Sequence, residues 1–405
     1  MAGVFSGGAR RPPPPSRPVA PPPRRLAFGL TEANADLLWS PSAAVAVPAA
    51  FARWRAALSA LRPAYLRLVL DWAQLQPSAS RPPDLDGPVN GCLRGLPPCG
   101  AYAGVRGELE AIASQQRTQG GFAVVIVLDG VPAWAAAPPS GCERAGTQAL
   151  SRPIAAAGLV AYRALIADLL ALGRSVGVSL AYWSPWNEPN HPYFISPQRA
   201  VCRRSSPSLA PAVYAQLARA MARALAADPA PHSMLLGELA GYTRRAVHET
   251  SIAEFVADLP SDVICLARVW TVHDYVSPGT LAFPVTPVSE LEAALDRRGP
   301  CGERASVWVT ETGAADTRPP ARTAATHAPT APTVAAGCEA LAAQLARWYA
   351  DPRVTAVFQY TFREDTDFPV GLADARLTHL YPAYGLWLAL ATGPPGAAPS
   401  TTLCT

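Results

Sequence analysis

The chain has 405 residues, half of them hydrophobic, which is enough for one large core or two smaller ones. Its net charge is +4 at pH 7, and five of its 34 basic residues precede the first acidic residue: Arg10, Arg11, Arg17, Arg24 and Arg25. The remainder is close to neutral, which argues against a nucleic-acid-binding face. The sequence contains no lysine, which excludes Schiff-base catalysis and a P-loop.

Residues 1–24 are rich in proline, arginine and glycine, and this composition predicts a disordered or extended tail. From Arg25 onward, apolar runs alternate with amphipathic segments. The apolar runs predict strands at Leu26–Leu30, Tyr65–Leu70, Phe122–Leu128, Val178–Trp183, Met234–Gly237, Leu266–Val272, Val307–Thr310 and Val354–Tyr360. The amphipathic segments predict helices at Val47–Leu61, Val105–Gln116, Pro153–Val176, Leu209–Asp228, Ile252–Leu259, Val288–Arg297, Val334–Tyr349 and Pro382–Leu390.

These alternations predict an α/β fold with a parallel sheet, and eight strands is the number of a closed barrel. We therefore predict a single-domain (β/α)8 TIM barrel over residues 25–395, followed by a C-terminal tail at 396–405. Two doubly wound domains would also alternate, but no proline- or glycine-rich linker divides the chain, and no G-x-G-x-x-G follows a strand. Barrel active sites are built at the C-terminal face, and we expect there the long loops at 71–104, 129–152, 184–208 and 311–333.

The histidines form no familiar metal motif. Only six are present, and none lies in an H-x-H or H-E-x-x-H pattern, so the common zinc hydrolase patterns are absent. We therefore expect neither a metal nor another cofactor. No apolar run reaches the roughly 18 residues of a membrane span, so no membrane-spanning segment is expected.

Eight cysteines, mostly in loops rich in glycine and proline, indicate disulfides and an extracellular or cell-surface protein. Metal binding is the alternative, but the spacings are irregular and no C-x-x-C occurs. Residues 1–25 contain no apolar segment typical of a signal peptide, so this location is inferred from the cysteines. Three pairings are hypotheses: Cys92 with Cys99, Cys142 with Cys202, and Cys265 with Cys301. Cys338 and Cys404 are then left without an assigned partner.

Two carboxylates stand at the ends of predicted strands. Glu188 lies in Y-W-S-P-W-N-E-P-N, where the proline stops the strand, and Glu311 lies in S-V-W-V-T-E-T-G. Aromatic neighbours disfavour the ionised form of Glu188 and are expected to raise its pKa, as a general acid requires. The alternative is a strand-end glutamate that caps the next loop. About three βα units, at roughly 30 to 45 residues each, separate the two glutamates, which places them on strands 4 and 7.

The W-N-E-P-N segment, followed three units later by a strand-end V-T-E, resembles glycoside hydrolase clan A, with features of families 39 and 5. This resemblance covers about residues 25–395 and is strongest at strands 4 and 7. It implies an enzyme, a retaining glycoside hydrolase that cleaves β-glycosidic bonds of an oligo- or polysaccharide by double displacement. Glu188 would be the acid/base and Glu311 the nucleophile. Such pairs lie about 5 to 5.5 Å apart.

Four further residues match positions of this clan. Arg67, in the middle of strand 2, matches an arginine beneath the nucleophile, and Asn187 matches the asparagine that binds the sugar 2-hydroxyl. His273 and Tyr275, at the end of strand 6, match a pair in which the tyrosine holds the nucleophile and the histidine contacts the substrate. The alternative interpretations are an arginine at an exposed strand edge, a turn-forming asparagine, and a histidine and a tyrosine of the core.

Aromatic side chains bind the apolar faces of sugar rings. Trp134, in V-P-A-W-A after strand 3, resembles the P-x-W of family 39-like barrels. Many clan members place a tryptophan under the sugar on strand 8, whereas this chain has F-Q-Y-T-F there, so Tyr360 or Phe362 is the expected substitute. Other candidate platforms, each of which can equally belong to the core, are Trp72, Trp186 and Trp308.

A second function class stays open: a barrel that binds carbohydrate without hydrolysing it. A pseudoenzyme has no reason to keep both Glu188 and Glu311, which favours the enzyme. Glu238, which ends strand 5, and Glu32, which follows strand 1, are interpreted as structural or hydrogen-bonding residues. The expected partner is a carbohydrate substrate, and the protein is expected to be a monomer.

Overall fold

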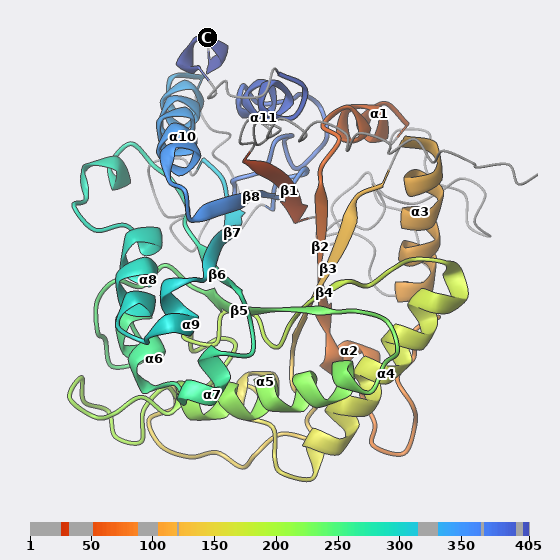
Figure 1. Cartoon of the computed structure of the whole chain (residues 1–405), viewed down its shortest axis with the longest axis vertical. Coiled ribbons are helices and arrows are strands. Elements are labelled where there is room, and N and C mark those ends of the chain that lie inside the picture. Colours follow the sequence, from red (N-terminus) through yellow and green to blue (C-terminus); the bar gives the residue numbers. More distant parts are fainter. Residues whose placement is uncertain are drawn as a thin grey trace, which may run out of the picture.

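Eight parallel strands form the centre of the molecule. The computed structural model describes residues 26–31, 52–87, 104–119, 121–314, 331–365, 368–393 and 400–404. The strands pair in chain order, and the last pairs with the first, so the barrel is closed (Figure 1). This arrangement confirms the predicted (β/α)8 TIM barrel. The predicted tail at residues 1–24, Glu32, and the ring of Cys92 and Cys99 lie outside the described residues.

Figure 1 shows the strands as an inner ring and the helices around them. The strands are β1 (Ala27–Thr31), β2 (Tyr65–Asp71), β3 (Ala123–Asp129), β4 (Tyr182–Ser184), β5 (Ser233–Leu239), β6 (Val269–His273), β7 (Ser306–Thr312) and β8 (Val354–Tyr360). The α-helices are α1 (Ala52–Ala60), α2 (Trp72–Leu75), α3 (Gly104–Gln119), α4 (Gly158–Val176), α5 (Ala210–Ala226), α6 (Ile252–Asp258), α7 (Ser261–Ile264), α8 (Pro287–Asp296), α9 (Pro300–Glu303), α10 (Ala331–Ala350) and α11 (Ala383–Thr392). Short 3-10 helices are η4 (Ala149–Ser151), η5 (Thr280–Ala282) and η6 (Thr401–Cys404).

Side chains that alternate along each strand separate two hydrophobic cores. In β3, Val124 and Ile126 belong to the large core between strands and helices, whereas Val125 and Val127 belong to the smaller core inside the barrel. The smaller core is completed by Leu235, Trp308, Ala356 and Phe358. The barrel interior is therefore packed below the strand ends, and a site can form only at the mouth.

Two tryptophans that were candidate sugar platforms belong to these cores. Trp308 is 5% exposed and packs against Tyr65 and Phe358 inside the barrel. Trp72 is fully buried beside Tyr162. A ring enclosed on both faces cannot stack on a sugar, so the platform hypothesis is wrong for both residues.

β4 is shorter than the predicted strand Val178–Trp183. The nitrogen of Val178 donates a hydrogen bond to the carbonyl of Gly173, and Gly177 adopts a left-handed conformation that ends α4. The first residues of the apolar run thus complete the cap of a helix, as glycine-terminated helices commonly require. Pairing with β3 begins only at Tyr182.

Three disulfides lie in the described part of the chain. The predicted pairs Cys142–Cys202 and Cys265–Cys301 are both present. The third joins the two cysteines left over in the prediction, Cys338 on α10 and Cys404 in η6. It ties the C-terminal segment to the barrel.

Thiol titration of the denatured, unreduced protein is expected to find at most two free thiols. The three disulfides occupy all cysteines of the described residues, and bonds of this kind persist in an oxidising environment. The same sample after reduction should show all eight cysteines. Eight thiols before reduction would contradict the disulfide framework.

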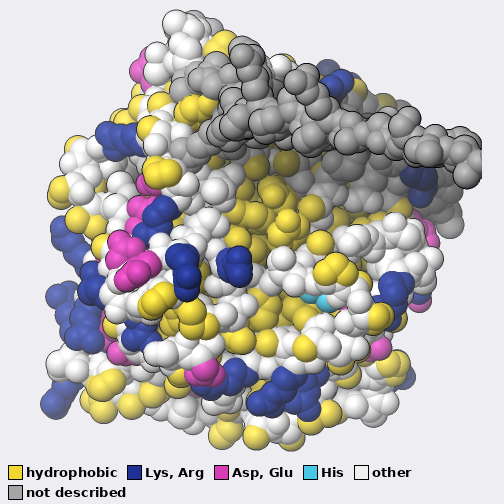
Figure 2. All heavy atoms as spheres, viewed as in Figure 1, with side chains coloured by type: hydrophobic (Ala, Val, Ile, Leu, Met, Phe, Trp, Pro, Cys, Tyr) yellow, Lys and Arg dark blue, Asp and Glu magenta, His cyan; other side chains and the backbone are white. Residues whose placement is uncertain are grey.

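Figure 2 shows the surface in the same view. Hydrophobic side chains gather in the middle of this face, and basic side chains lie mostly toward its left and lower edges, with acidic ones among them. Because the chain has no lysine, every basic side chain in this view is an arginine. Among the described helices, none is long and apolar enough to cross a bilayer.

Candidate active site

The functional candidates converge near the mouth of the barrel, most of them from the carboxyl ends of their strands and Arg67 from within β2. Arg67 lies on β2, Glu238 on β5 and Glu311 on β7, while His273 ends β6. Asn187 and Glu188 follow β4 directly, where Pro185 has already ended the strand. In a closed barrel the strand ends surround one point, so residues far apart in sequence meet there.

Arg67 is fully buried at the centre of this site. One terminal nitrogen donates to Glu311 Oε1 at 2.6 Å, and the other donates to Asn187 Oδ1 at 2.7 Å and to Glu238 Oε2 at 2.9 Å. Charge-assisted hydrogen bonds of this length are strong, and they fix the carboxylates in place. The alternative interpretation, an arginine at an exposed strand edge, does not apply.

Replacing Arg67 with methionine is expected to lower the free energy of unfolding by about 3 to 5 kcal/mol, because Glu238 and Glu311 would remain buried without their cation. The measurement is urea unfolding at neutral pH. A matched control is Arg219→Met, which breaks the exposed pair with Asp262 and should cost less than about 1 kcal/mol. Equal stability losses in the two variants would contradict the central position of Arg67.

Both oxygens of Glu311 are occupied by donors. Arg67 holds Oε1, and the Tyr275 hydroxyl donates to Oε2 at 2.5 Å. Tyr275 itself packs edge-on against Tyr360, 6.2 Å between ring centroids, and against Phe368 at 4.5 Å. The carboxylate of Glu311 is thus oriented by one charged and one neutral donor beside an aromatic wall.

Glu188 lies in a tight turn and keeps part of its surface open. Its φ is 34°, a left-handed conformation that is uncommon for a non-glycine residue and often occurs at functional sites. The side chain of Asn190 fixes the turn, because its amide bonds the carbonyls of Ala240 and Thr250. The Glu188 side chain is 17% exposed, and its Oε1 lies 2.8 Å from His273 Nδ1.

The two glutamates of interest face each other across a short gap. One carboxylate oxygen of Glu188, one of Glu311 and a ring nitrogen of His273 all lie within 4.8 Å of one another. Such a trio can in principle hold a metal ion, but Arg67 already places a positive charge 2.6 Å from Glu311. The hydrogen bonds of Arg67 and Tyr275 already occupy both oxygens of Glu311. The groups fit a hydrogen-bonded ionic network better than a metal centre.

His273 bridges this network. Its Nε2 lies 3.0 Å from Glu238 Oε2, opposite the contact of Nδ1 with Glu188. Burial alone would lower the pKa of His273, but the charge of Glu311 and the hydrogen bonds with Glu188 and Glu238 outweigh it and raise the pKa to about 9. The imidazole is therefore positively charged at neutral pH.

The same contact reverses an expectation about Glu188. Burial would raise the pKa of Glu188, but the hydrogen bond and charge of His273 bring it below its ordinary value. Aromatic crowding predicted the opposite direction. The reason is that Trp183 and Trp186 are buried in the large core between strands and helices, whereas the His273 imidazolium lies against the Glu188 carboxylate.

Trp186 is not positioned to bind a sugar. It is 1% exposed, packs against Tyr162, and donates its indole N–H to the carbonyl of Phe194 at 2.9 Å. The expectation of a platform is therefore corrected to a core residue. Trp134 is half-buried after β3 and donates its N–H to the carbonyl of Gln76, and Tyr360 ends β8 beside Tyr275.

Glu238 makes more contacts within the site than the surrounding sequence predicted. It is fully buried and accepts hydrogen bonds from Arg67, from the Thr310 hydroxyl at 2.8 Å, and from His273. Burial would raise its pKa, but the charge of Arg67 and the contact with His273 lower the pKa to about 2. Its position after a strand-end glycine was the available signal.

A further carboxyl that the sequence interpretation missed is Asp129, the last residue of β3. It lies beside Asp71 at the same level of the barrel. Burial and the charge of Asp71 raise the pKa of Asp129 to about 7. Its Oδ1 has no hydrogen-bond partner among the described residues. The signal was again a carboxylate at the end of a predicted strand.

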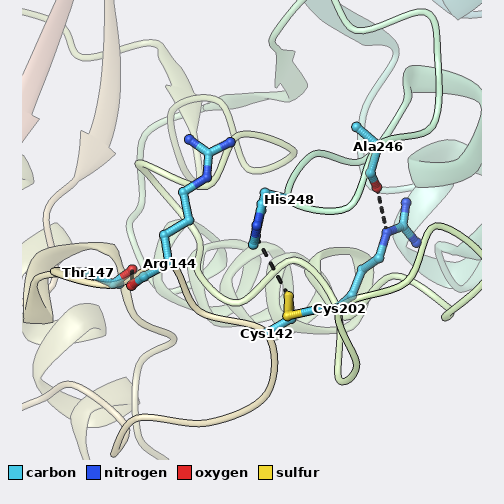
Figure 3. Close-up of a disulfide and its surroundings, with 7 residues drawn as sticks. Cys142, Arg144, Thr147, Cys202, Ala246 and His248 are labelled. Atoms are coloured by element: carbon cyan, nitrogen blue, oxygen red, sulfur yellow. Dashed lines mark hydrogen bonds between the residues drawn. A yellow bond between two sulfur atoms is a disulfide. The ribbon is translucent and has the colours of Figure 1, made fainter.

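The loops on the Glu188 side are tied together. The disulfide Cys142–Cys202 joins the loops after β3 and β4, and His248 from the loop after β5 lies 3.8 Å from the sulfur of Cys142 (Figure 3). The buried Arg199 then links the loop after β4 to α6 through both oxygens of Glu254, at 2.8 Å each. These links limit movement of the turn that carries Glu188.

The barrel is similar to several solved structures. A family 39 glycoside hydrolase from the gut symbiont Bacteroides cellulosilyticus WH2 has a TM-score of 0.54 and 15% identity, over 92% of this chain and 64% of that chain. The GH39 enzyme from Xanthomonas axonopodis pv. citri has a TM-score of 0.53 and 14% identity, over 91% and 66%. A conserved exported protein from Bacteroides fragilis has a TM-score of 0.56 and 13% identity, over 92% and 80%.

These similarities show a shared fold. Sequence identities this low support no conclusion beyond the fold. The chain spans less than two thirds of the length of the Bacteroides cellulosilyticus enzyme. No protein-family model and no curated protein matches the sequence.

Proposed function

We propose that this protein is a retaining glycoside hydrolase that cleaves β-glycosidic bonds by double displacement. The observation that carries the proposal is the short gap between two carboxylates, since oxygens of Glu188 and Glu311 approach within 4.8 Å. Retaining pairs lie about 5 to 5.5 Å apart, whereas inverting pairs need about 6.5 to 9.5 Å to admit a water molecule. Structural neighbours whose names identify them as family 39 glycoside hydrolases support the proposal.

Glu311 is the proposed nucleophile. Arg67 and Tyr275 hold its oxygens, which orients the carboxylate for attack on the anomeric carbon. Glu188 is the proposed acid/base, because it is the partly open member of the pair. It protonates the leaving oxygen in the first step. In the second step it takes a proton from the water that displaces Glu311.

The remaining proposed contacts follow from hydrogen bonding and shape. Arg67 occupies Oδ1 of Asn187, which leaves the amide nitrogen to donate to the sugar 2-hydroxyl. Tyr360, beside Tyr275, is the proposed floor under the sugar in place of a strand-8 tryptophan. Trp134 is the proposed platform on the β3 side.

The natural substrate class is a β-linked oligo- or polysaccharide, and we infer that the protein works outside the cell or at its surface. The disulfides support an oxidising compartment. We expect a monomer that needs no cofactor.

The test is a panel of aryl β-glycosides: glucoside, xyloside, galactoside, mannoside and arabinoside. We expect hydrolysis of at least one, and NMR of the first-formed product should show retained anomeric configuration. Inverted product would contradict the two-step mechanism. Binding of sugars without hydrolysis of any substrate would favour the non-catalytic barrel instead.

A further inference from the structure

His273 has a carboxylate oxygen opposite each of its ring nitrogens. Nδ1 lies 2.8 Å from Glu188 and 3.3 Å from Glu311, and Nε2 lies 3.0 Å from Glu238. An ionised carboxylate accepts hydrogen bonds and donates none, so both contacts are satisfied only when each nitrogen carries a proton. Because the pKa values of Glu188 and Glu238 are both lowered, the two carboxylates are ionised and the resting ring is in the imidazolium form.

The charged and titratable groups around this ring come from every side of the barrel. Arg67 is the only other cation that bonds the same carboxylates among the described residues, and it contacts Glu238 and Glu311. His191 follows Glu188 in the same turn and interacts with its charge. The groups are Arg67 on β2, Asp129 on β3, Glu188 and His191 after β4, Glu238 on β5, Tyr275 after β6, Glu311 on β7 and Tyr360 on β8.

Glu238 has no role in the two-carboxylate mechanism, yet the fold holds it in a demanding conformation. Its φ is 50°, and the preceding Gly237 has a φ of 111°. A Cβ on Gly237 would lie 2.3 Å from the carbonyl oxygen of Thr271, so only glycine fits there. This bulge between β5 and β6 turns the carboxylate of Glu238 onto Nε2 of His273.

We propose that His273 and Glu188 together supply the acid of the reaction, and that Glu238 is a positioning residue that keeps His273 doubly protonated. The proposal rests on the proposed glycosidase function. A carboxylate that pairs with an imidazolium stays ionised, so Glu188 alone has no proton to donate. The ring stores the proton instead, because the charge of Glu311, together with the hydrogen bonds of the ring to Glu188 and Glu238, raises the pKa of His273 to about 9.

The proton transfers balance without a further reactant. Glu188 begins as a carboxylate that accepts from Nδ1–H. The Nδ1 proton passes to Glu188, which leaves a neutral imidazole with its remaining proton on Nε2, directed at Glu238. Glu188 gives that proton to the leaving oxygen, which keeps the electron pair of the broken C–O bond, while Glu311 bonds to the anomeric carbon. In the second step the proton of the attacking water returns through Glu188 to Nδ1.

The first measurement needs no substrate. In wild-type protein labelled with 15N-histidine, the His273 signals are assigned by their absence from His273→Gln. We expect both ring nitrogens to carry protons at pH 7 and to keep them until about pH 9. A neutral ring at pH 7 would overturn the proposal, whether or not any glycoside is hydrolysed.

The second measurement is the pH dependence of kcat/KM in Glu238→Gln. Removal of the negative charge lowers the pKa of the imidazolium, so the basic limb should move to lower pH by about one to two units. Thr310→Val is the matched control, because it removes a hydrogen bond to Glu238 without changing any charge, and its basic limb should stay in place. A rate loss in Glu238→Gln that is equal at every pH would mean a merely structural role and would overturn the proposal.

The two proposals fail in different ways. If wild-type protein hydrolyses no glycoside, the proposed function falls and the acid role of His273 falls with it. NMR still tests whether Glu238 keeps His273 doubly protonated. In Glu238→Gln the ring should lose a proton at lower pH than in wild type. An unchanged NMR titration in that variant would overturn the positioning role.

Discussion

Glu311→Ala is expected to reduce turnover by roughly 10⁵-fold or more, because the variant lacks the carboxylate that forms the glycosyl-enzyme bond. Sodium azide should then restore turnover and give a glycosyl azide of inverted configuration. The small anion can enter the space left by the carboxylate and attack the anomeric carbon from the same face. The measurement is turnover of an activated aryl glycoside with and without azide, with NMR of the product.

Glu303→Ala is the matched control, since Glu303 is an exposed glutamate on α9. It should retain wild-type activity and gain nothing from azide. Full activity in Glu311→Ala would end the glycosidase proposal. Azide rescue with retained configuration would exchange the roles assigned to Glu188 and Glu311.

Glu188→Ala is expected to behave differently, with a loss of about 10² to 10⁴-fold that depends on the leaving group. Substrates with good leaving groups need no protonation, so they should still form the glycosyl-enzyme in a rapid burst. Deglycosylation should be slow because no base activates the water. Azide should accelerate that step and give a product of retained configuration.

The measurement for Glu188→Ala is stopped-flow release of the aryl group, followed by NMR of the azide product. The same loss for good and poor leaving groups would contradict an acid role. Inverted product would again exchange the two glutamates. The stereochemistry of rescue therefore distinguishes the residues more clearly than the loss of rate does.

The fold was predictable because its signals are local. Apolar runs of strand length alternate with amphipathic segments, and strand-end residues such as Glu188 and Glu311 can be located by counting βα units. The buried ion pair of Arg67 was also predictable, since an arginine in the middle of an apolar strand requires an acidic partner. These inferences need only local patterns and their spacing along the chain.

The properties that the sequence did not reveal depend on partners from distant segments. The pKa of Glu188 follows from His273, 85 residues later in the chain, rather than from the neighbouring tryptophans. Glu238 was interpreted as a secondary hydrogen-bonding residue, yet it becomes central because Arg67 and His273 both meet it inside the closed barrel. Neither contact leaves a trace in the sequence around Glu238.

The sequence also did not reveal which aromatic side chains are exposed. Trp72, Trp186 and Trp308 lie near strand ends or within strands, as a sugar platform would, but packing by helices and opposite strands buries all three. Phe368, beside Tyr275, has no signal in the sequence, because its segment follows β8 outside any predicted element. Burial is decided by tertiary packing, which periodicity alone does not fix.

Trapping of the glycosyl-enzyme intermediate tests the central claim most directly. The protein is incubated with activated 2-deoxy-2-fluoro glycosides of the sugars in the panel, and the digested product is analysed by mass spectrometry. We expect one added fluoroglycosyl group per chain, located on the peptide that contains Glu311, and the same treatment of Glu311→Ala should add none. A label on any other residue, or hydrolysis of the parent glycoside by a protein that is never labelled, would contradict the proposed double displacement at Glu311.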